Sequence, residues 1–297
     1  MTIWDQVSQQ VSTVTGQPFT IFNKRSVRGG SINSAYVLEG ESVNYFVKSN
    51  VAKKIDMFDA EAQGLREIAN AGVIRIPTPI CWDVADESAY LVLEYIALGA
   101  SSKASFEELG RCMANMHKVI HSQYGWHREN TIGFTPQKNI FSDDWISFWR
   151  EHRLGYQLNL VIRNGYNGNF RTKLEKLMRD LPKLLNGYKP VASLLHGDLW
   201  AGNYAVDAKA SPVIFDPAVY YGDREADIAM TELFGGFPPQ FYAAYNEAYP
   251  LSDGYRVRKT LYNLYHVLNH LNLFGSGYLA QAEHMTDMLL SEINNQF

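Results

Sequence analysis

The sequence has few cysteines and no long apolar run. Two of its 297 residues are cysteine, Cys81 and Cys112, and two thiols cannot form the disulfide framework of a small secreted domain. No apolar stretch approaches the roughly 20 residues that cross a bilayer, and the segment after Met1 lacks the basic and apolar regions of a signal peptide. We therefore expect a protein of the reducing cytoplasm that neither spans a membrane nor carries structural disulfides.

The charge is nearly balanced. The net charge of −4 gives the chain no general attraction for nucleic acid or an anionic membrane. Apolar residues make up 46% and charged residues 20% of the chain, which is the composition of an ordinary globular protein. A length of 297 residues allows one large domain or two lobes with separate cores.

The pattern of the sequence changes near residue 95. A first helix is expected to begin at Thr2, which forms a capping-box pattern with Asp5. Short strand-like segments then surround a helical pattern at 56–71. These expected strands are 19–27, 34–38, 43–48, 80–84 and 90–95. We predict an α+β protein with a small β-rich N-terminal lobe, 1–95, and a larger helical C-terminal lobe, 96–297.

Helical patterns dominate the second part and are interrupted once, between 194 and 222. The expected helices are 106–121, 143–162, 171–185, 224–234, 239–248, 255–274 and 277–293. The aromatic residues at 145, 148, 149 and 152 recur at helical spacing and are expected in the core or at a lobe interface, not at a cofactor site. Two histidine pairs have the i,i+4 spacing that can bind zinc, His117 with His121 and His266 with His270, but no cysteine cluster accompanies them. We expect all four to be structural.

Two carboxylates and an amide are spaced as phosphoryl transfer requires. Asp198 lies five residues before Asn203, and Asp216 follows Asn203 by thirteen residues. Such a reaction needs one carboxylate to orient the attacking hydroxyl and accept its proton, and oxygen ligands to hold Mg²⁺. The segment 196–203 resembles the kinase catalytic loop, with Gly197 where protein kinases commonly have arginine. By this resemblance Asp198 is the catalytic base, and Asn203 and Asp216 are metal ligands.

The N-terminal part contains groups that suit the phosphates of ATP. Lys48 ends an expected strand, and Glu61 lies in the helix that follows. A single lysine or glutamate is usually a solvated surface charge, but this order resembles the lysine–glutamate pair of kinases. Asp59 is the alternative partner if the helix has a different phase.

Two further segments are candidates for nucleotide binding. Gly29, Gly30 and Ser31 form a turn between expected strands, where backbone N–H groups can approach phosphate oxygens. The chain has no Walker A motif, and the turn is not a dinucleotide-binding fingerprint because a strand follows it. Glu94, Tyr95 and Ile96 stand where the backbone of a kinase hinge would bind adenine.

Taken together, the motifs resemble those of the fructosamine kinase (ketosamine 3-kinase) family. The similar segments are 29–33, 35–36, 58–65, 124–126, 130–133, 135–137, 144–145, 148–149, 153–154, 196–203, 216–218 and 220–227. The resemblance implies a protein-kinase-like fold, ATP and Mg²⁺ as cofactors, and phosphorylation of the sugar O3 of a ketoamine, either a small molecule or a glycated lysine of a protein. The unstable 3-phosphate would eliminate and return the free amine. Ser31 replaces the cysteine that many members carry, so redox control through this turn is not expected.

Three residues are candidates for binding the substrate. Trp200, in the catalytic loop, could stack on the sugar or pack the loop onto its lobe. Asp223 and Glu225, at the start of an expected helix, could meet the cationic amine, although acids are common in a first helical turn. Asp227 could instead anchor the catalytic loop. Two alternative functions remain: a kinase of another small alcohol, such as an aminoglycoside, choline or homoserine, and a nucleotide-binding regulatory pseudokinase.

Overall fold

The structure is a computed structural model that describes residues 2–27 and 32–295. It consists of two compact units. The first comprises Met1–Ser105 and Tyr204–Pro217, and the second Phe106–Asn203 and Ala218–Phe297. Within the described ranges, no helix is long and apolar enough to cross a membrane.

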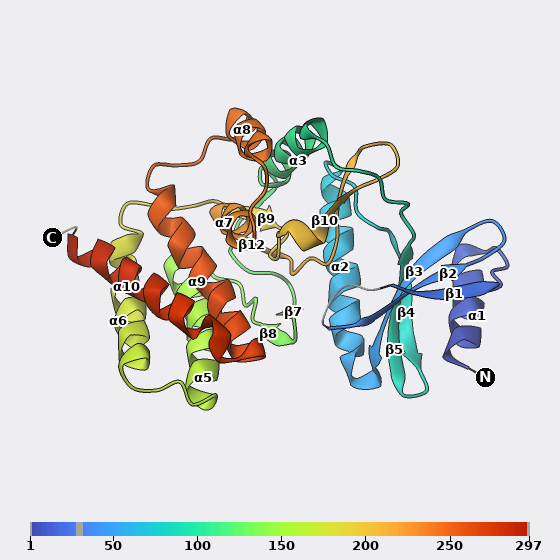
Figure 1. Cartoon of the computed structure of the whole chain (residues 1–297), viewed down its shortest axis with the longest axis horizontal. Coiled ribbons are helices and arrows are strands. Elements are labelled where there is room, and N and C mark those ends of the chain that lie inside the picture. The colour runs from blue at the N-terminus through green and yellow to red at the C-terminus, as the bar shows by residue number, and fades with distance from the viewer. Residues whose placement is uncertain (1, 28–31, 296–297) are drawn as a thin grey trace. The chain divides into compact units, whose positions relative to one another are not determined.

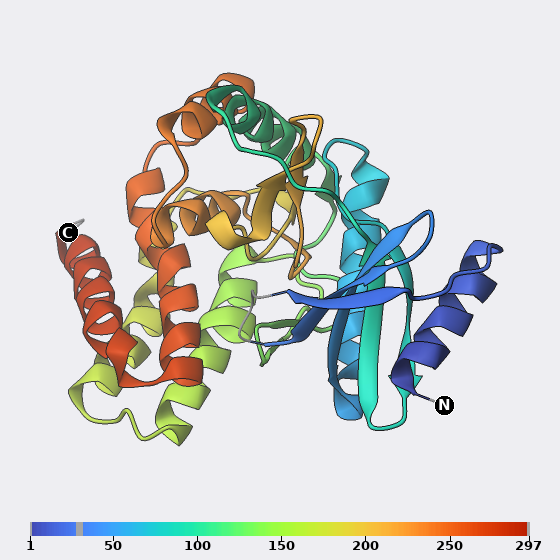
Figure 2. The ribbon, with the colours of Figure 1, turned by 45° about the vertical axis from the view of Figure 1, so that its right-hand side comes forward.

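An antiparallel sheet forms the centre of the first unit. Its strand order is β1-β2-β3-β5-β4 in the part of the chain that the structure describes. The elements of this unit are α1 (Ile3–Thr15), β1 (Asn23–Val27), β2 (Ser34–Glu39), β3 (Asn44–Val51), η1 (Ala52–Lys54), α2 (Ile55–Ala71), β4 (Pro79–Ala85), β5 (Ser88–Glu94) and the hairpin of β10 (Tyr204–Val206) and β11 (Pro212–Ile214). Helices α1 and α2 cover opposite faces of the sheet (Figures 1 and 2).

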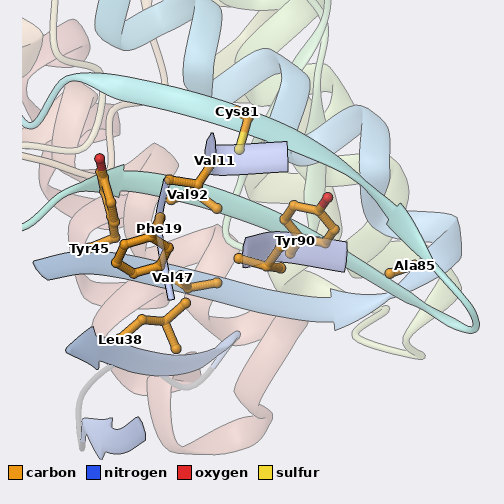
Figure 3. Packing of buried hydrophobic residues seen from close by; sticks show 10 residues of the cluster. Val11, Phe19, Leu38, Tyr45, Val47, Cys81, Ala85, Tyr90 and Val92 are labelled. Carbon is orange, nitrogen blue, oxygen red and sulfur yellow. The ribbon is translucent and has the colours of Figure 1, made fainter. Parts of the chain in front are cut away.

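The capping box at the start of α1 is confirmed. The Asp5 carboxylate accepts from the N–H of Thr2 at 2.7 Å, and the Thr2 hydroxyl accepts from the N–H of Asp5 at 3.3 Å. The helix buries Val7 and Val11 against the sheet, where they join the apolar cluster shown in Figure 3. Val14, near the end of the helix, is 56% exposed.

The strand predicted at 19–27 begins only at Asn23. The preceding segment is fixed by α1: the N–H of Phe19 donates to the Ser12 hydroxyl at 2.8 Å, and the Phe19 carbonyl accepts from the Ser8 hydroxyl. The Phe19 ring packs edge-on against Tyr45 with a centroid distance of 4.8 Å (Figure 3). Contacts with α1 therefore hold the segment before Asn23, in place of pairing with a strand.

The second unit is mainly helical. Its elements are α3 (Lys103–Met116, which begins in the first unit), β6 (Ile120–His121), β7 (Asn130–Ile132), β8 (Thr135–Gln137), α4 (Trp145–Phe148), the π-helix η2 (Trp149–Leu154), α5 (Gly155–Arg163), α6 (Asn169–Leu184), β9 (Ala192–Leu195), η3 (Ala201–Asn203), β12 (Tyr220–Gly222), α7 (Glu225–Leu233), α8 (Pro239–Ala248), α9 (Tyr255–Phe274), η4 (Ser276–Tyr278) and α10 (Leu279–Asn295). Helices α5, α6, α9 and α10 pack side by side (Figures 1 and 2).

Two expectations for this unit are wrong. The helix predicted at 106–121 ends at Met116, and Ile120–His121 instead forms β6, which pairs with β9. The helical part is therefore interrupted a second time, by β6 and the β7–β8 hairpin. The helix predicted at 143–162 is present as one continuous helical run from Trp145 to Arg163, with the π-helix η2 in its middle. The aromatic residues of this segment do lie in the core, with Trp145 3% exposed and Trp149 fully buried, as predicted.

Candidate active site

Strand alternation places Lys48 on the face of the sheet that α2 covers. Val47 points into the cluster beneath α1, so its neighbour Lys48 points to the opposite face. There the Lys48 ammonium donates to Oε1 of Glu61 on α2 at 2.6 Å and also contacts Oδ1 of Asp216. The alternative partner, Asp59, accepts from the indole N–H of Trp82 at 2.9 Å. The structure thus brings Lys48, Glu61 and Asp216 together within the first unit.

These three charges are unbalanced. Burial by itself would lower the pKa of Lys48, but the nearby carboxylates of Asp216 and Glu61 raise it above its ordinary value. Burial, together with the charge of Asp216, raises the pKa of Glu61 even though Lys48 opposes the shift. Two carboxylates thus face one ammonium group, and the Asp216 side chain is 45% exposed. Asp216 can therefore also face a solvated cation.

The backbone at Asp216 is unusual. Its φ is +58°, in the left-handed region that non-glycine residues seldom adopt. Residues in such conformations cluster at functional sites, where the surrounding structure holds them. Asp216 follows the β10–β11 hairpin, as the spacing from Asn203 predicts.

The catalytic-loop motif begins where β9 ends. Gly197 has a φ of +81°, and a Cβ at this position would lie 2.1 Å from the carbonyl oxygen of Ala218. No larger side chain can replace Gly197 without moving the backbone, which explains why this loop lacks the arginine common in protein kinases. The N–H of Ala218 donates to the His196 carbonyl at 2.8 Å and joins the two segments.

Asp227, on α7, anchors this loop, which confirms its predicted structural role. Its carboxylate accepts from the backbone N–H groups of His196 at 2.7 Å and Gly197 at 2.8 Å, and it lies 3.2 Å from Nε2 of His117. Burial by itself would raise the pKa of Asp227, but the hydrogen bond and charge of His117, the charge of His196 and the N–H of Gly197 lower it. The loop is thus held by a buried, ionised carboxylate.

Asp198 and Asn203 are joined within the second unit. The Asn203 amide N–H₂ donates to the Asp198 carbonyl at 2.9 Å and to its Oδ2 at 3.2 Å. Because the amide nitrogen serves Asp198, the amide oxygen of Asn203 is the group that can face a cation. Asp198 is half-buried.

The structure places the other predicted nucleotide-binding residues as follows. Gly29, Gly30 and Ser31 lie outside the described residues. Glu94 ends β5, and its carboxylate binds the guanidinium of Arg75. Tyr95 and Ile96 follow directly and are half-buried, so the segment predicted to bind adenine begins where the strand ends.

The predicted substrate residues differ in exposure. Trp200 is 38% exposed, and its indole lies over Gly202, where a Cβ would come within 2.3 Å of the ring. Asp223 and Glu225 are fully buried. Asp223 accepts from the Tyr262 hydroxyl and, at 3.1 Å, from Tyr188.

Glu225 forms a bidentate ion pair with Arg258, at 2.6 and 2.9 Å. Burial, and secondarily the charge of Glu225, raises the pKa of Asp223 to about 6. These internal partners argue against a contact of either carboxylate with the amine of a substrate.

Sequence reasoning missed a buried polar network that binds the carbonyls of residues 218 and 219. The Gln137 amide donates to the Ala218 carbonyl at 3.1 Å, and the Asn130 amide donates to the Val219 carbonyl at 2.7 Å. Gln137 also donates to Oδ1 of Asn130 at 2.9 Å. These bonds fix the backbone just after Asp216. Asn130 and Gln137 lie in segments that resemble the fructosamine kinase family. An asparagine or a glutamine alone, however, does not indicate a role at a site.

The histidine pairs have partners inside the protein. His117 contacts the Tyr245 hydroxyl at 2.7 Å as well as Asp227. Nδ1 of His270 lies 2.8 Å from the carbonyl of His266, one turn earlier in α9. Across residues 2–27 and 32–295, no group of three or more His, Cys, Asp or Glu side chains is arranged to hold a metal ion.

Buried His266 is expected to make the protein less stable in mild acid. Burial, and secondarily the charge of His270, lowers the pKa of His266 from 6.5 to about 3, with Asp227 opposing and Arg153 adding to the shift. The unfolded chain therefore binds more protons between these pKa values, and stability falls as the pH drops below about 6.5. Between pH 7 and pH 5 this residue is expected to remove on the order of 1–2 kcal/mol from the free energy of unfolding.

Urea denaturation of the wild type and of His266→Gln at both pH values measures this effect. The raised pKa values of Asp223 and Glu61 act in the opposite direction, so the difference between the variant and the wild type isolates His266. His284→Gln, at an exposed position on α10, is the control. An unchanged pH dependence in His266→Gln would contradict the prediction.

Comparison with known proteins identifies the family. The family model for fructosamine kinase matches residues 3–292. A probable ketoamine kinase of Synechocystis is 48% identical over 97% of both chains, and a chloroplastic protein-ribulosamine 3-kinase of Oryza sativa subsp. japonica is 39% identical over 95% of this chain and 83% of its own. The crystal structure of a putative fructosamine-3-kinase from Haemophilus somnus has a TM-score of 0.90 at 29% identity and covers 97% of this chain and 100% of its own.

More distant structures have the same fold. Choline kinase LicA from Streptococcus pneumoniae has a TM-score of 0.66 at 16% identity, covering 97% of this chain and 98% of its own. These similarities confirm the predicted kinase-like α+β fold. The chain belongs to the fructosamine kinase family and is an ATP-dependent phosphotransferase.

Proposed function

We propose that this protein transfers the γ-phosphate of MgATP to the O3 hydroxyl of a ketoamine, the adduct of a sugar with an amine. The observation that carries the proposal is the pairing of Lys48 with Glu61 and Asp216, together with the Asp198–Asn203 pair, in a chain similar over 97% of its length to a probable ketoamine kinase. The unstable 3-phosphate would release the free amine, so the biological role would be repair of glycated molecules in the cytoplasm.

Each residue would contribute one function to the transfer. Lys48, held by Glu61, would bind phosphate oxygens. The backbone at 94–96 would bind adenine. Asp198 would orient the attacking hydroxyl and accept its proton. Residues 1–95 would thus serve mainly the nucleotide, and residues 96–297 catalysis and the substrate.

The oxygen donors of Asp216 and Asn203 are of the kind that a magnesium ion prefers. Asp216 offers a partly exposed carboxylate, and the Asn203 amide oxygen is available because its nitrogen binds Asp198. Mg²⁺ prefers oxygen ligands and commonly takes only one or two from the protein, with water and phosphate completing its shell. When bound, the ion would neutralise negative charge on the phosphates. Asp216 would then be shared between Lys48 and the metal.

The substrate is proposed to be a ketoamine borne by lysine, either as a free adduct or on a protein. Relatives at 39% identity are named protein-ribulosamine 3-kinases. This name supports a substrate in which the sugar is attached to a lysine of a protein. Trp200 would stack on the sugar, because its side chain is partly exposed two residues after Asp198.

A panel of acceptors tests the proposed function. ADP release by the purified protein with MgATP would be measured with fructosyl-lysine, ribulosyl-lysine, an aminoglycoside, choline and no acceptor. We expect kcat/KM for a ketoamine to exceed that for the other alcohols by on the order of 100-fold or more, because a site with groups placed to hydrogen-bond its substrate rejects analogues that leave them unpaired. Preference for another alcohol would overturn the substrate class, and ATP binding without turnover would favour a regulatory protein.

A further inference from the structure

A continuous row of aromatic rings begins in the catalytic loop. Trp200 lies edge-on to Phe234 at a centroid distance of 6.5 Å, Phe234 lies 4.7 Å from His270, and His270 lies 5.4 Å from Phe274 and 5.1 Å from Tyr278. We call these five residues the aromatic strip. All of them belong to the second unit, so their arrangement is internal to one compact part of the protein.

Several elements that pack together build the strip. His270 and Phe274 lie one turn apart on α9, Tyr278 lies in η4, and Phe234 immediately follows α7. Helices α7 and α9 contact each other, and η4 contacts α9. The strip therefore has a rigid support, which a ligand site requires.

The strip is open to solvent, unlike the aromatic core of the same unit. Phe274 is 53% exposed and Trp200 is 38% exposed, whereas Trp149 is fully buried. Phe234, His270 and Tyr278 are half-buried. An exposed row of rings that leads away from a catalytic loop is poorly explained by packing, since the rings at its ends bury only part of their area.

The electrostatics of the strip suit a cation. Ring faces carry negative potential and attract ammonium groups within about 6 Å of the ring centroid. Burial lowers the pKa of His270 and its hydrogen bond to the His266 carbonyl only partly opposes this shift, so the imidazole is neutral at physiological pH and does not repel a cation. A ketoamine is a secondary amine that is protonated at this pH and carries an alkyl chain when it derives from lysine. Both parts can lie on aromatic rings.

We propose that the aromatic strip binds the amine side of the substrate: the secondary ammonium and the alkyl chain of a lysine side chain that carries the sugar. This inference rests on the proposed function. Trp200 begins the strip at the catalytic loop, where the backbone N–H of Trp200 donates to the Asp198 carbonyl at 3.2 Å. The sugar would lie between Asp198 and Trp200, and the lysine arm would extend over Phe234 towards Phe274.

Two ketoamines with the same sugar test the inference, one on methylamine and one on Nα-acetyl-lysine amide. Phe274→Ala is expected to raise KM for the lysine adduct by about 5- to 10-fold, the loss of a partly exposed aromatic contact with the lysine arm, and to change KM for the methylamine adduct by less than about twofold. Phe274→Leu, which keeps an apolar side chain, is expected to lose less than the alanine variant, because the part of the substrate at this position is the alkyl arm. Phe22→Ala, at a 66% exposed phenylalanine in the other unit, is the control.

Each alternative outcome is distinct. Equal losses for both adducts, or no loss for either, would overturn the strip as a site for the lysine arm. A KM for the lysine adduct that rises as much in Phe274→Leu as in Phe274→Ala would overturn the apolar contact between this position and the alkyl arm. A wild-type protein that phosphorylates neither adduct would overturn the proposed function itself, and the inference with it.

Discussion

Replacing Asp198 by asparagine is expected to lower kcat by about 10²- to 10⁴-fold, the range that a positioned general base contributes. Asparagine keeps the shape of the side chain but cannot accept the proton of the attacking hydroxyl. The carboxylate accepts one hydrogen bond from Asn203 at 3.2 Å, and an amide oxygen can accept the same bond. The loop geometry should therefore survive, and the loss should fall on kcat.

Steady-state ADP release and ATP binding by calorimetry measure the two effects separately. ATP affinity is expected to change by less than about threefold, because Asp198 is assigned to the hydroxyl and not to the phosphates. The control is Asp287→Asn, which removes an exposed carboxylate that pairs with Lys173 on the surface. A kcat within tenfold of wild type in Asp198→Asn would show that another group accepts the proton.

Replacing Asp227 by asparagine is expected to lower the free energy of unfolding by about 2–4 kcal/mol and to reduce kcat as well. The Asp227 carboxylate accepts from two backbone N–H groups and lies against His117, in an environment with 1% exposure. An amide would present an N–H₂ group to one of these donors, and each buried donor left without an acceptor costs about 1–3 kcal/mol. Because the donors belong to His196 and Gly197, the loop that carries Asp198 should shift.

Urea denaturation at pH 7 and steady-state kinetics measure both parts of this prediction. Asp287→Asn again serves as the surface control, with an expected change within about 0.5 kcal/mol. Wild-type stability in Asp227→Asn would show that the loop is held by other contacts. Reduced stability with unchanged kcat would show that the anchor supports the fold without positioning Asp198.

Local sequence determined much of this protein. The capping box of Thr2 and Asp5, the helices at 239–248 and 255–274 and the strand pattern before residue 95 follow from periodicity and end signals that each act over a few residues. The spacing of Asp198, Asn203 and Asp216 indicated a kinase because it, too, is a pattern within a short stretch of sequence. The loop and the hairpin that connect these residues are short, so the spacing constrains where they can lie.

Only the tertiary structure decided the remaining features, because they depend on partners distant in sequence. Residues 120–121 read as helix but pair with β9, about 70 residues later. Asp223 and Glu225 read as possible amine ligands, but Tyr262 and Arg258, on α9, hold them in the interior.

The aromatic strip, too, combines three segments that no local pattern connects. Sequence periodicity reports which residues avoid water, whereas packing between elements decides which buried or exposed groups meet.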